Sequence, residues 1–156
     1  MREAIGGAWL YYIFVVMIIF LVSFLAIFLN YMAAYRANNR VISILEQSEG
    51  IVPGNINEMI NGNFSLGQNG DFKSCTISYG NKSFVIRVAA FMRLQIPLVN
   101  LPISVPVKNE TRSINCYGDP GASGYKCPPD NVTSSLRTYL NYEAGADGNC
   151  PSNSGW

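Results

Sequence analysis

The sequence predicts an α+β protein: a long N-terminal membrane-spanning helix that continues into an amphipathic stem, followed by a small antiparallel β domain with disulfide-tied C-terminal loops. Residues 8–35 contain no Lys, Arg, Asp or Glu, and about 20 apolar residues in a helix cross a bilayer core. Strand-like segments begin at residue 74. All four cysteines follow the apolar segment. We therefore divide the chain into a helix and stem, residues 1–50, and a β-rich domain outside the cytoplasm, residues 51–156.

The helix is predicted to run from about residue 4 to residue 49, past the membrane surface. No Gly or Pro occurs from Asn30 to Glu49, and Gly50 and Pro53 mark its end. Apolar residues recur at helical spacing along the stem and form a narrow stripe, which we expect to pack against the domain that follows. The candidates for helix assembly are Glu3, Gly6, Gly7, Ala33, Ala37, Val41, Ile44 and Leu45.

The N-terminal candidates have simpler interpretations beside their assembly roles. Gly6 and Gly7 would let neighbouring helices approach closely, and a flexible turn at the membrane face explains them equally well. Glu3 is placed to pair with the N-terminal amine of a neighbour. A carboxylate solvated at the membrane face is the favoured interpretation of Glu3.

The apolar segment is interpreted as a retained anchor rather than as a cleaved signal peptide. A signal peptide carries an apolar region of about 7–15 residues after a basic region, whereas this run is much longer and follows only a short N-terminus. The flanking charges, Arg2 and the α-amine before the segment and Arg36 and Arg40 after it, are close to a tie under the positive-inside rule, or lean slightly against an external C-terminal domain. The cysteines therefore decide the expected orientation, with the C-terminal domain extracytoplasmic.

The cysteines are predicted to form two disulfides. No C-x-x-C pair occurs and the chain has no histidine, so a zinc site is disfavoured against disulfides in an oxidising compartment. Four reduced thiols in a cytosolic domain are the alternative, and three pairings remain open. The disulfide candidates are Cys75, Cys116, Cys127 and Cys150. Glycosylation sequons, which would mark an external surface in a host that makes N-glycans, occur at Asn63, Asn81, Asn109 and Asn131.

The β domain is predicted from turn signals and alternation. A hairpin is expected around Gly80-Asn81, between strands at Ser74–Tyr79 and Ser83–Met92. Residues 93–107 contain three prolines, which favours an edge strand or an extended segment. Short helical segments are expected at residues 53–60 and 134–142.

No catalytic set is visible in the sequence. The absence of histidine excludes Ser-His and Cys-His chemistry, and the carboxylates of the domain are scattered singly. A net charge of +1 gives no reason to expect nucleic-acid binding. We therefore expect no enzyme activity, no cofactor, no metal and no small-molecule substrate, and expect the partners to be the lipid bilayer and copies of the chain or related subunits.

The order of segments resembles a known family. A short N-terminus (REAIGGAW), an apolar span, a stem beginning NYMAAYR and a Pro-interrupted strand (LQIPLVNLPISVPVKNETRSI) are similar to type IV pilin-like proteins, and more narrowly to the TadE-like pseudopilins of tight-adherence pilus systems. The resemblance covers about residues 1–114. Processed pilins carry Glu after the glycine cleavage site, whereas here Glu3 precedes Gly6 and Gly7. Either this chain is not processed or it lies outside the pilins.

The resemblance implies a non-enzymatic structural subunit, a pilin-like component of an extracellular filament or of a pilus or secretion assembly, that packs through its N-terminal helix. The alternative is a single-pass membrane glycoprotein that acts as a scaffold or minor structural protein of a large membrane-containing virus, which the sequons and cysteines fit as well. An adhesin would need an exposed site that the sequence does not reveal. The host, the partner proteins and the processing of the N-terminus remain open at this point.

Overall fold

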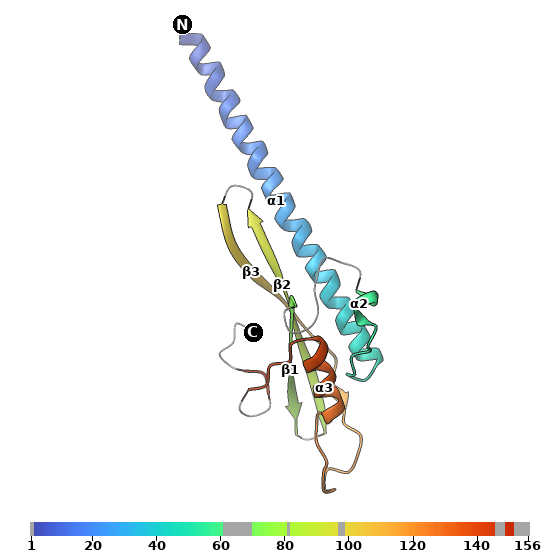
Figure 1. Ribbon diagram of the computed structural model, residues 1–156. Helices are drawn as coiled ribbons and strands as arrows, with labels where there is room; N and C mark the ends of the chain where they lie inside the picture. Colours follow the sequence, from blue (N-terminus) through green and yellow to red (C-terminus); the bar gives the residue numbers. More distant parts are fainter. Residues whose placement is uncertain (1, 61–69, 81, 97–98, 146–148, 152–156) are drawn as a thin grey trace.

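The computed structural model describes residues 2–60, 70–80, 82–96, 99–145 and 149–151, with the backbone alone for 2–6 and 93–103. The α+β class is confirmed (Figure 1). One long helix lies against an antiparallel sheet, and two short helices flank the helix end. The elements are α1 (Arg2–Gln47), α2 (Ile56–Met59), β1 (Phe72–Tyr79), β2 (Ser83–Ile96), β3 (Val99–Glu110), β4 (Ile114–Asn115) and α3 (Asp130–Tyr139).

Helix α1 ends where the sequence predicts, at a glycine in the left-handed conformation. Gly50 has a φ of 89° and its N–H donates to the Leu45 carbonyl at 2.7 Å. A Cβ built at this position would lie 3.2 Å from Ile86 Cδ1 and 3.3 Å from Phe84 Cε2. Position 50 therefore requires glycine for two reasons: the left-handed backbone conformation and the close packing against the sheet.

The sheet has the order β1-β2-β3, and the short β4 pairs with the start of β2. The predicted hairpin is confirmed, with Tyr79 opposite Ser83, although Asn81 lies outside the described residues. Strand β1 begins at Phe72, two residues before the predicted start, because Phe72 is fully buried in the hydrophobic core and pairs with Ala90 of β2.

The prediction of one extended segment over residues 93–107 is wrong. Strand β2 continues to Ile96, and β3 begins at Val99 and runs antiparallel to it, with Arg93 opposite Ser104. The part from Val99 onwards is an edge strand as expected, and it contains Pro102 and Pro106. An edge strand tolerates proline because its outer N–H groups need no partner in the sheet.

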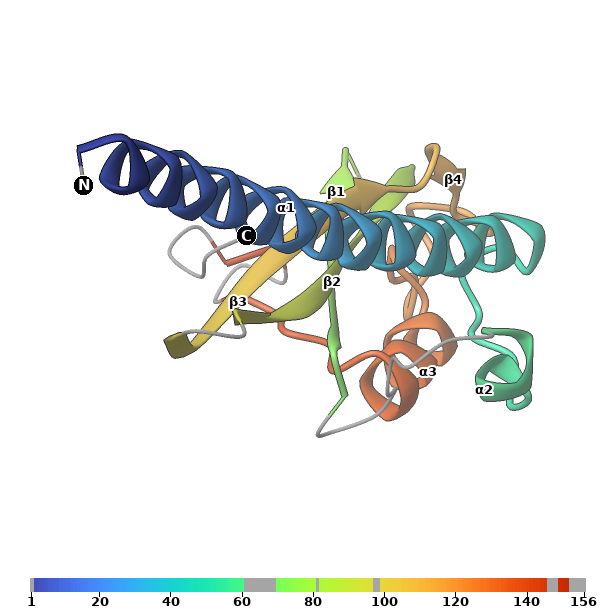
Figure 2. The same ribbon diagram turned by 90° about the horizontal axis from the view of Figure 1, so that it is seen from above.

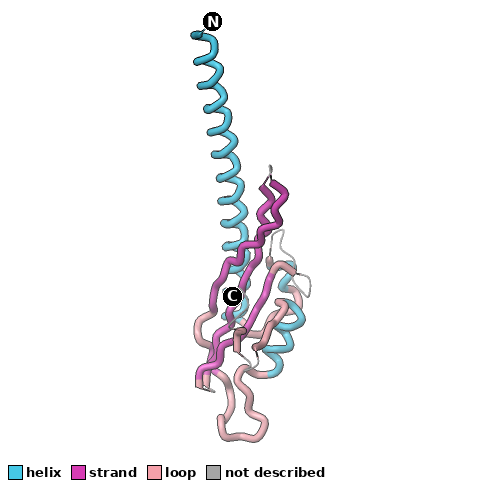
Figure 3. The backbone as a smooth tube through the Cα atoms, turned by 90° about the vertical axis from the view of Figure 1, so that its left-hand side faces the viewer, coloured by secondary structure: helices cyan, strands magenta, loops and turns pink. Residues whose placement is uncertain are grey.

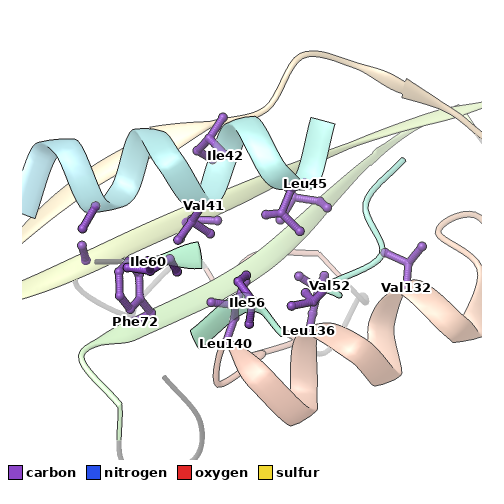
Figure 4. Packing of buried hydrophobic residues seen from close by; sticks show 14 of the residues in the cluster. Val41, Ile42, Leu45, Val52, Ile56, Ile60, Phe72, Val132, Leu136 and Leu140 are labelled. Atoms are coloured by element: carbon purple, nitrogen blue, oxygen red, sulfur yellow. The ribbon is translucent and has the colours of Figure 1, made fainter. Parts of the chain in front are cut away.

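The core lies between the C-terminal half of α1, one face of the sheet, and the two short helices (Figure 4). Helix α3 starts four residues before the predicted Ser134, because Val132, Leu136 and Leu140 form one buried face at a spacing of four. The members of this cluster on the other elements include Val41, Leu45, Val52, Ile56, Phe72, Phe84, Ile86 and Val88.

Two disulfides tie the C-terminal region to the sheet, and the predicted bridges are confirmed. They pair Cys75 with Cys150 and Cys116 with Cys127. Cys75 lies in β1 and is fully buried, so the first bridge holds the chain end against the outer strand. The oxidised state is typical of a domain outside the cytoplasm.

The molecule is elongated, and its sheet runs along the helix rather than across it. Figure 2 shows α1 lying over the sheet, and its N-terminal half extends beyond the rest of the chain. Figure 3 shows the β2–β3 hairpin extending along α1 towards the N-terminus. The helix is thus half embedded in the domain and half projecting.

Candidate assembly surface

The projecting half of α1, which we call the rod (residues 8–35), is apolar and open to its surroundings. Its most apolar window has a mean hydropathy of 3.0 and no buried residue. By length and composition it fits a membrane span or a signal sequence, and it is the one such helix among the described residues. Large exposed side chains cover the rod on all sides, among them Trp9, Leu10, Phe14, Phe20, Phe24 and Leu29.

The two ends of the rod carry aromatic residues that match membrane interfaces. Trp9 and Tyr12 lie at the N-terminal end, and Tyr31 and Tyr35 at the end next to the domain, all exposed. Aromatic belts at the headgroup level are typical of spanning helices. Inside the rod, Ser23 Oγ donates to the Ile19 carbonyl at 2.8 Å, so this hydroxyl needs no outside partner.

The stem half of α1 buries its apolar stripe in the chain's own domain. Ala37, Val41 and Leu45 are buried and Ile44 is half-buried. Ala33 is exposed, because the neighbouring Ala34 takes the position facing the sheet. The stripe therefore packs against the domain, as expected, and the exposed surface left for assembly is the rod.

The N-terminal candidates lie at the far end of α1. Glu3, Gly6 and Gly7 all belong to the helix, and a Cβ built at Gly7 would meet nothing within 4 Å. The backbone at Gly7 is thus open to close approach by another helix, which is the role that small residues play in packed membrane helices.

A polar contact fixes the stem to the sheet, and the sequence stripe does not reveal it. Asn38 is fully buried, and its Nδ2 donates to the carbonyls of Val107 at 2.7 Å and Val88 at 3.3 Å. Within the described part of the chain its Oδ1 has no hydrogen-bond partner. Next to it, Asn109 Nδ2 donates to Asn39 Oδ1 at 2.5 Å. These contacts join α1 to β2 and β3 at once.

The C-terminal end of α1 is held by the loops beyond the sheet. The Arg112 N–H donates to Glu46 Oε1 at 2.7 Å, and the Tyr117 hydroxyl donates to Glu49 Oε1 at 3.0 Å. This hydrogen bond and the nearby carboxylate charge of Glu49 raise the pKa of Tyr117 above its ordinary value of 10.0.

No family model, no curated protein and no solved structure matches this chain. The architecture itself is pilin-like: a long apolar N-terminal helix, half of it projecting, followed by a small disulfide-tied antiparallel sheet.

The remaining candidates are sequons, and only two lie in the described residues. Asn131 is exposed at the start of α3. Asn109 is half-buried, and the Nδ2 atom to which a glycan would attach donates to Asn39. Asn63 and Asn81 lie outside the described residues. Among those that the structure describes, no three His, Cys, Asp or Glu residues gather as metal ligands would.

Proposed function

We propose that this chain is a non-enzymatic structural subunit that assembles through its rod into an extracellular filament or a pilus-type secretion assembly. The observation that carries the proposal is the division of α1: residues 8–35 project with an apolar surface that is mostly exposed, Ala34 being the one buried residue among them, while the rest of the helix is built into a disulfide-tied domain. The disulfides favour a domain outside the cytoplasm.

The rod cannot remain in water, because it exposes apolar side chains around its whole circumference. At 1.5 Å per residue it is about 42 Å long, which exceeds the bilayer core of about 30 Å. A bilayer would cover most of this length, and the rods of neighbouring subunits would cover it equally well. In this proposal the membrane holds the subunit before assembly, and the filament core replaces lipid with helices.

In this proposal, assembly is driven by burial of the apolar rods and involves no chemical reaction. Rods pack on one another through van der Waals contacts and through close approach at small residues such as Gly7. Because each rod continues directly into its domain, packed rods would place the domains on the outside of the assembly. The alternative, a membrane scaffold of a large virus, would use the same rod but leave single copies in the bilayer.

Cysteine cross-linking in the membrane tests this proposal. All four native cysteines are in disulfides, so an introduced cysteine is the single free thiol. Phe20→Cys places it in the rod, where Phe20 is 71% exposed. Tyr117→Cys is the matched control on the domain, where Tyr117 is 76% exposed.

We expect oxidation to link Phe20→Cys chains into dimers at low protein-to-lipid ratio, with much weaker linking of Tyr117→Cys. Electron microscopy of the material from the producing cell should then show an ordered helical lattice. Equal, low cross-linking of both variants would contradict assembly through the rod. Single copies beside a larger shell would favour the scaffold.

A further inference from the structure

We propose that the end of the β2–β3 hairpin is a second membrane-contacting element, which lies in the lipid headgroup layer beside α1. It comprises the last residues of β2, Leu94–Ile96, and the first of β3, Val99–Ile103. The inference rests on the rod being a membrane span, as proposed above. It goes beyond that function because it gives the sheet a lipid-binding role.

The hairpin end lacks charged residues. No Asp, Glu, Lys or Arg occurs from residue 94 to residue 107. Arg93 and Lys108 bound this segment, and Glu110 and Arg112 follow it closely. Moving a charged side chain into a less polar environment is costly, so a segment without charge can lie against lipid headgroups at a lower cost.

The packing on α1 places the hairpin at the level of the rod. Ala34, near the domain-side end of the rod and within it, is fully buried in a cluster with Met92 and Val107, and the partly buried Val105 packs against them. From Met92, β2 runs four residues further to Ile96, which adds about 13 Å at 3.3 Å per residue. The hairpin end therefore extends past Ala34 towards the N-terminus of α1.

The figures show the direction of this extension. In Figure 1 the hairpin lies beside the middle of α1 and points towards the N-terminus. In Figure 3 its end diverges from the helix. A bilayer that surrounds the rod would meet the hairpin end on the same side of the membrane as the domain.

The backbone of β3 limits how deeply the hairpin end can enter the bilayer, to the level of the lipid headgroups. An open sheet edge does not enter the hydrocarbon, because its N–H and C=O groups find no partners there. Headgroups and water supply such partners, and Pro102 and Pro106 remove two N–H donors from the edge strand. The rod exceeds a 30 Å core by about 12 Å, which leaves room for a headgroup-level contact next to the domain.

Depth-dependent quenching in vesicles tests this placement. Asn100→Cys and Leu101→Cys label adjacent positions of β3, which lie on opposite faces of a strand, so one label samples each face. Phe20→Cys in the rod and Tyr117→Cys on the domain are the references. Each full-length variant, with both native disulfides verified by intact mass, carries an environment-sensitive fluorophore in phosphatidylcholine vesicles. The quencher is a nitroxide either on the lipid headgroup or at carbon 12 of the acyl chain.

We expect at least one hairpin label to be quenched at least twofold more by the headgroup nitroxide than by the acyl nitroxide. The Phe20 label should show the reverse preference, and the Tyr117 label should be quenched by neither. If the Phe20 label is quenched but both hairpin labels are quenched as little as the Tyr117 label, the inference about the hairpin is overturned and the proposed membrane span of the rod still holds. Absence of quenching at Phe20 would overturn both.

Two further results would overturn the placement. Stronger quenching of the hairpin labels by the acyl nitroxide would put the hairpin in the hydrocarbon. A change in the emission of the hairpin labels that appears only at high protein-to-lipid ratio would show that a second copy of the chain, and not lipid, covers them. Quenching that is independent of this ratio supports the lipid contact.

Discussion

Replacing Asn38 with alanine is expected to cost little stability, whereas replacing it with aspartate is expected to detach the sheet from the helix. Asn38 is fully buried, and its Nδ2 donates to the carbonyls of Val88 and Val107. Its Oδ1 has no partner within the described residues. The amide therefore both stabilises and destabilises the contact between α1 and the sheet.

The two effects are similar in size. Two hydrogen bonds at about 0.5–1.5 kcal/mol each contribute about 1–3 kcal/mol, and one buried unpaired acceptor costs about 1–3 kcal/mol. Asn38→Ala removes both, so we expect a change in unfolding free energy below about 2 kcal/mol, including a small cavity. Asn38→Asp instead turns a carboxylate towards two carbonyl oxygens, and an uncompensated buried charge costs about 3–5 kcal/mol.

Guanidinium unfolding in a non-ionic detergent, followed by near-ultraviolet circular dichroism, measures the difference between the two variants. The aspartate penalty should shrink between pH 7 and pH 4, since protonation removes the buried charge. The alanine variant is the control for general effects of acid. Equal losses for Asn38→Ala and Asn38→Asp at pH 7 would refute the assigned hydrogen bonds.

Three other predictions use the same unfolding measurement or a titration. Removing the Cys75–Cys150 bridge by a double serine substitution should cost about 4.5 kcal/mol, and removing Cys116–Cys127 about 3 kcal/mol, because the first closes the longer loop. The opposite ranking would contradict this account. Leu45→Ala should cost about 2–5 kcal/mol, since Leu45 is fully buried under the sheet, and a loss under 1 kcal/mol would place it outside the core. In a carbon NMR titration, the phenol of Tyr117 should have a pKa above 10.0, and Glu49→Gln should bring this pKa back towards 10.0. The hydrogen bond from Tyr117 to Glu49 is present below the pKa of the phenol and is lost as the phenol ionises.

The sequence predicts the local elements well because their signals are local. The apolar run, the stop at Gly50 and the turn at Gly80 each depend on a few neighbouring residues. The β2–β3 hairpin was missed because Pro97-Leu98 is not a typical hairpin turn signal, and three prolines indicated an edge rather than a reversal. The pairing of Arg93 with Ser104 is a property of the sheet and not of the segment.

The site was predictable only in part. The rod followed from the absence of charge over residues 8–35. The disulfide pairing did not, since Cys75 and Cys150 meet only after the tail folds back along β1. The role of Asn38 could not be predicted from the sequence, because a single asparagine beside an apolar stripe is usually exposed to solvent. Its contacts with the sheet carbonyls are known only from the structure.

The edges of the sheet offer few free backbone groups to a neighbouring subunit, which agrees with the proposal that assembly occurs through the rod. An open sheet edge invites pairing with another chain, but both outer strands are blunted here. On β1 the tail forms a bridge between Tyr142 and Ser74, and the Glu143 N–H donates to the Ser74 carbonyl at 2.8 Å. On β3, Pro102 and Pro106 cannot donate to an added strand.

The domain is also held on the helix at several levels, so it follows the rod as one body. Contacts occur at Ala34, at Asn38 and at Glu46, over about 18 Å of helix. No Gly or Pro interrupts α1 between the rod and these contacts, so the helix has no residue that commonly allows a kink. If the rod lies in a bilayer or a filament, as proposed, its tilt would therefore set the orientation of the domain. A Gly-Pro insertion after Tyr31, before all three contacts, should uncouple the two, and polarised infrared spectroscopy of oriented bilayers would then show an unchanged helix tilt with a disordered sheet direction.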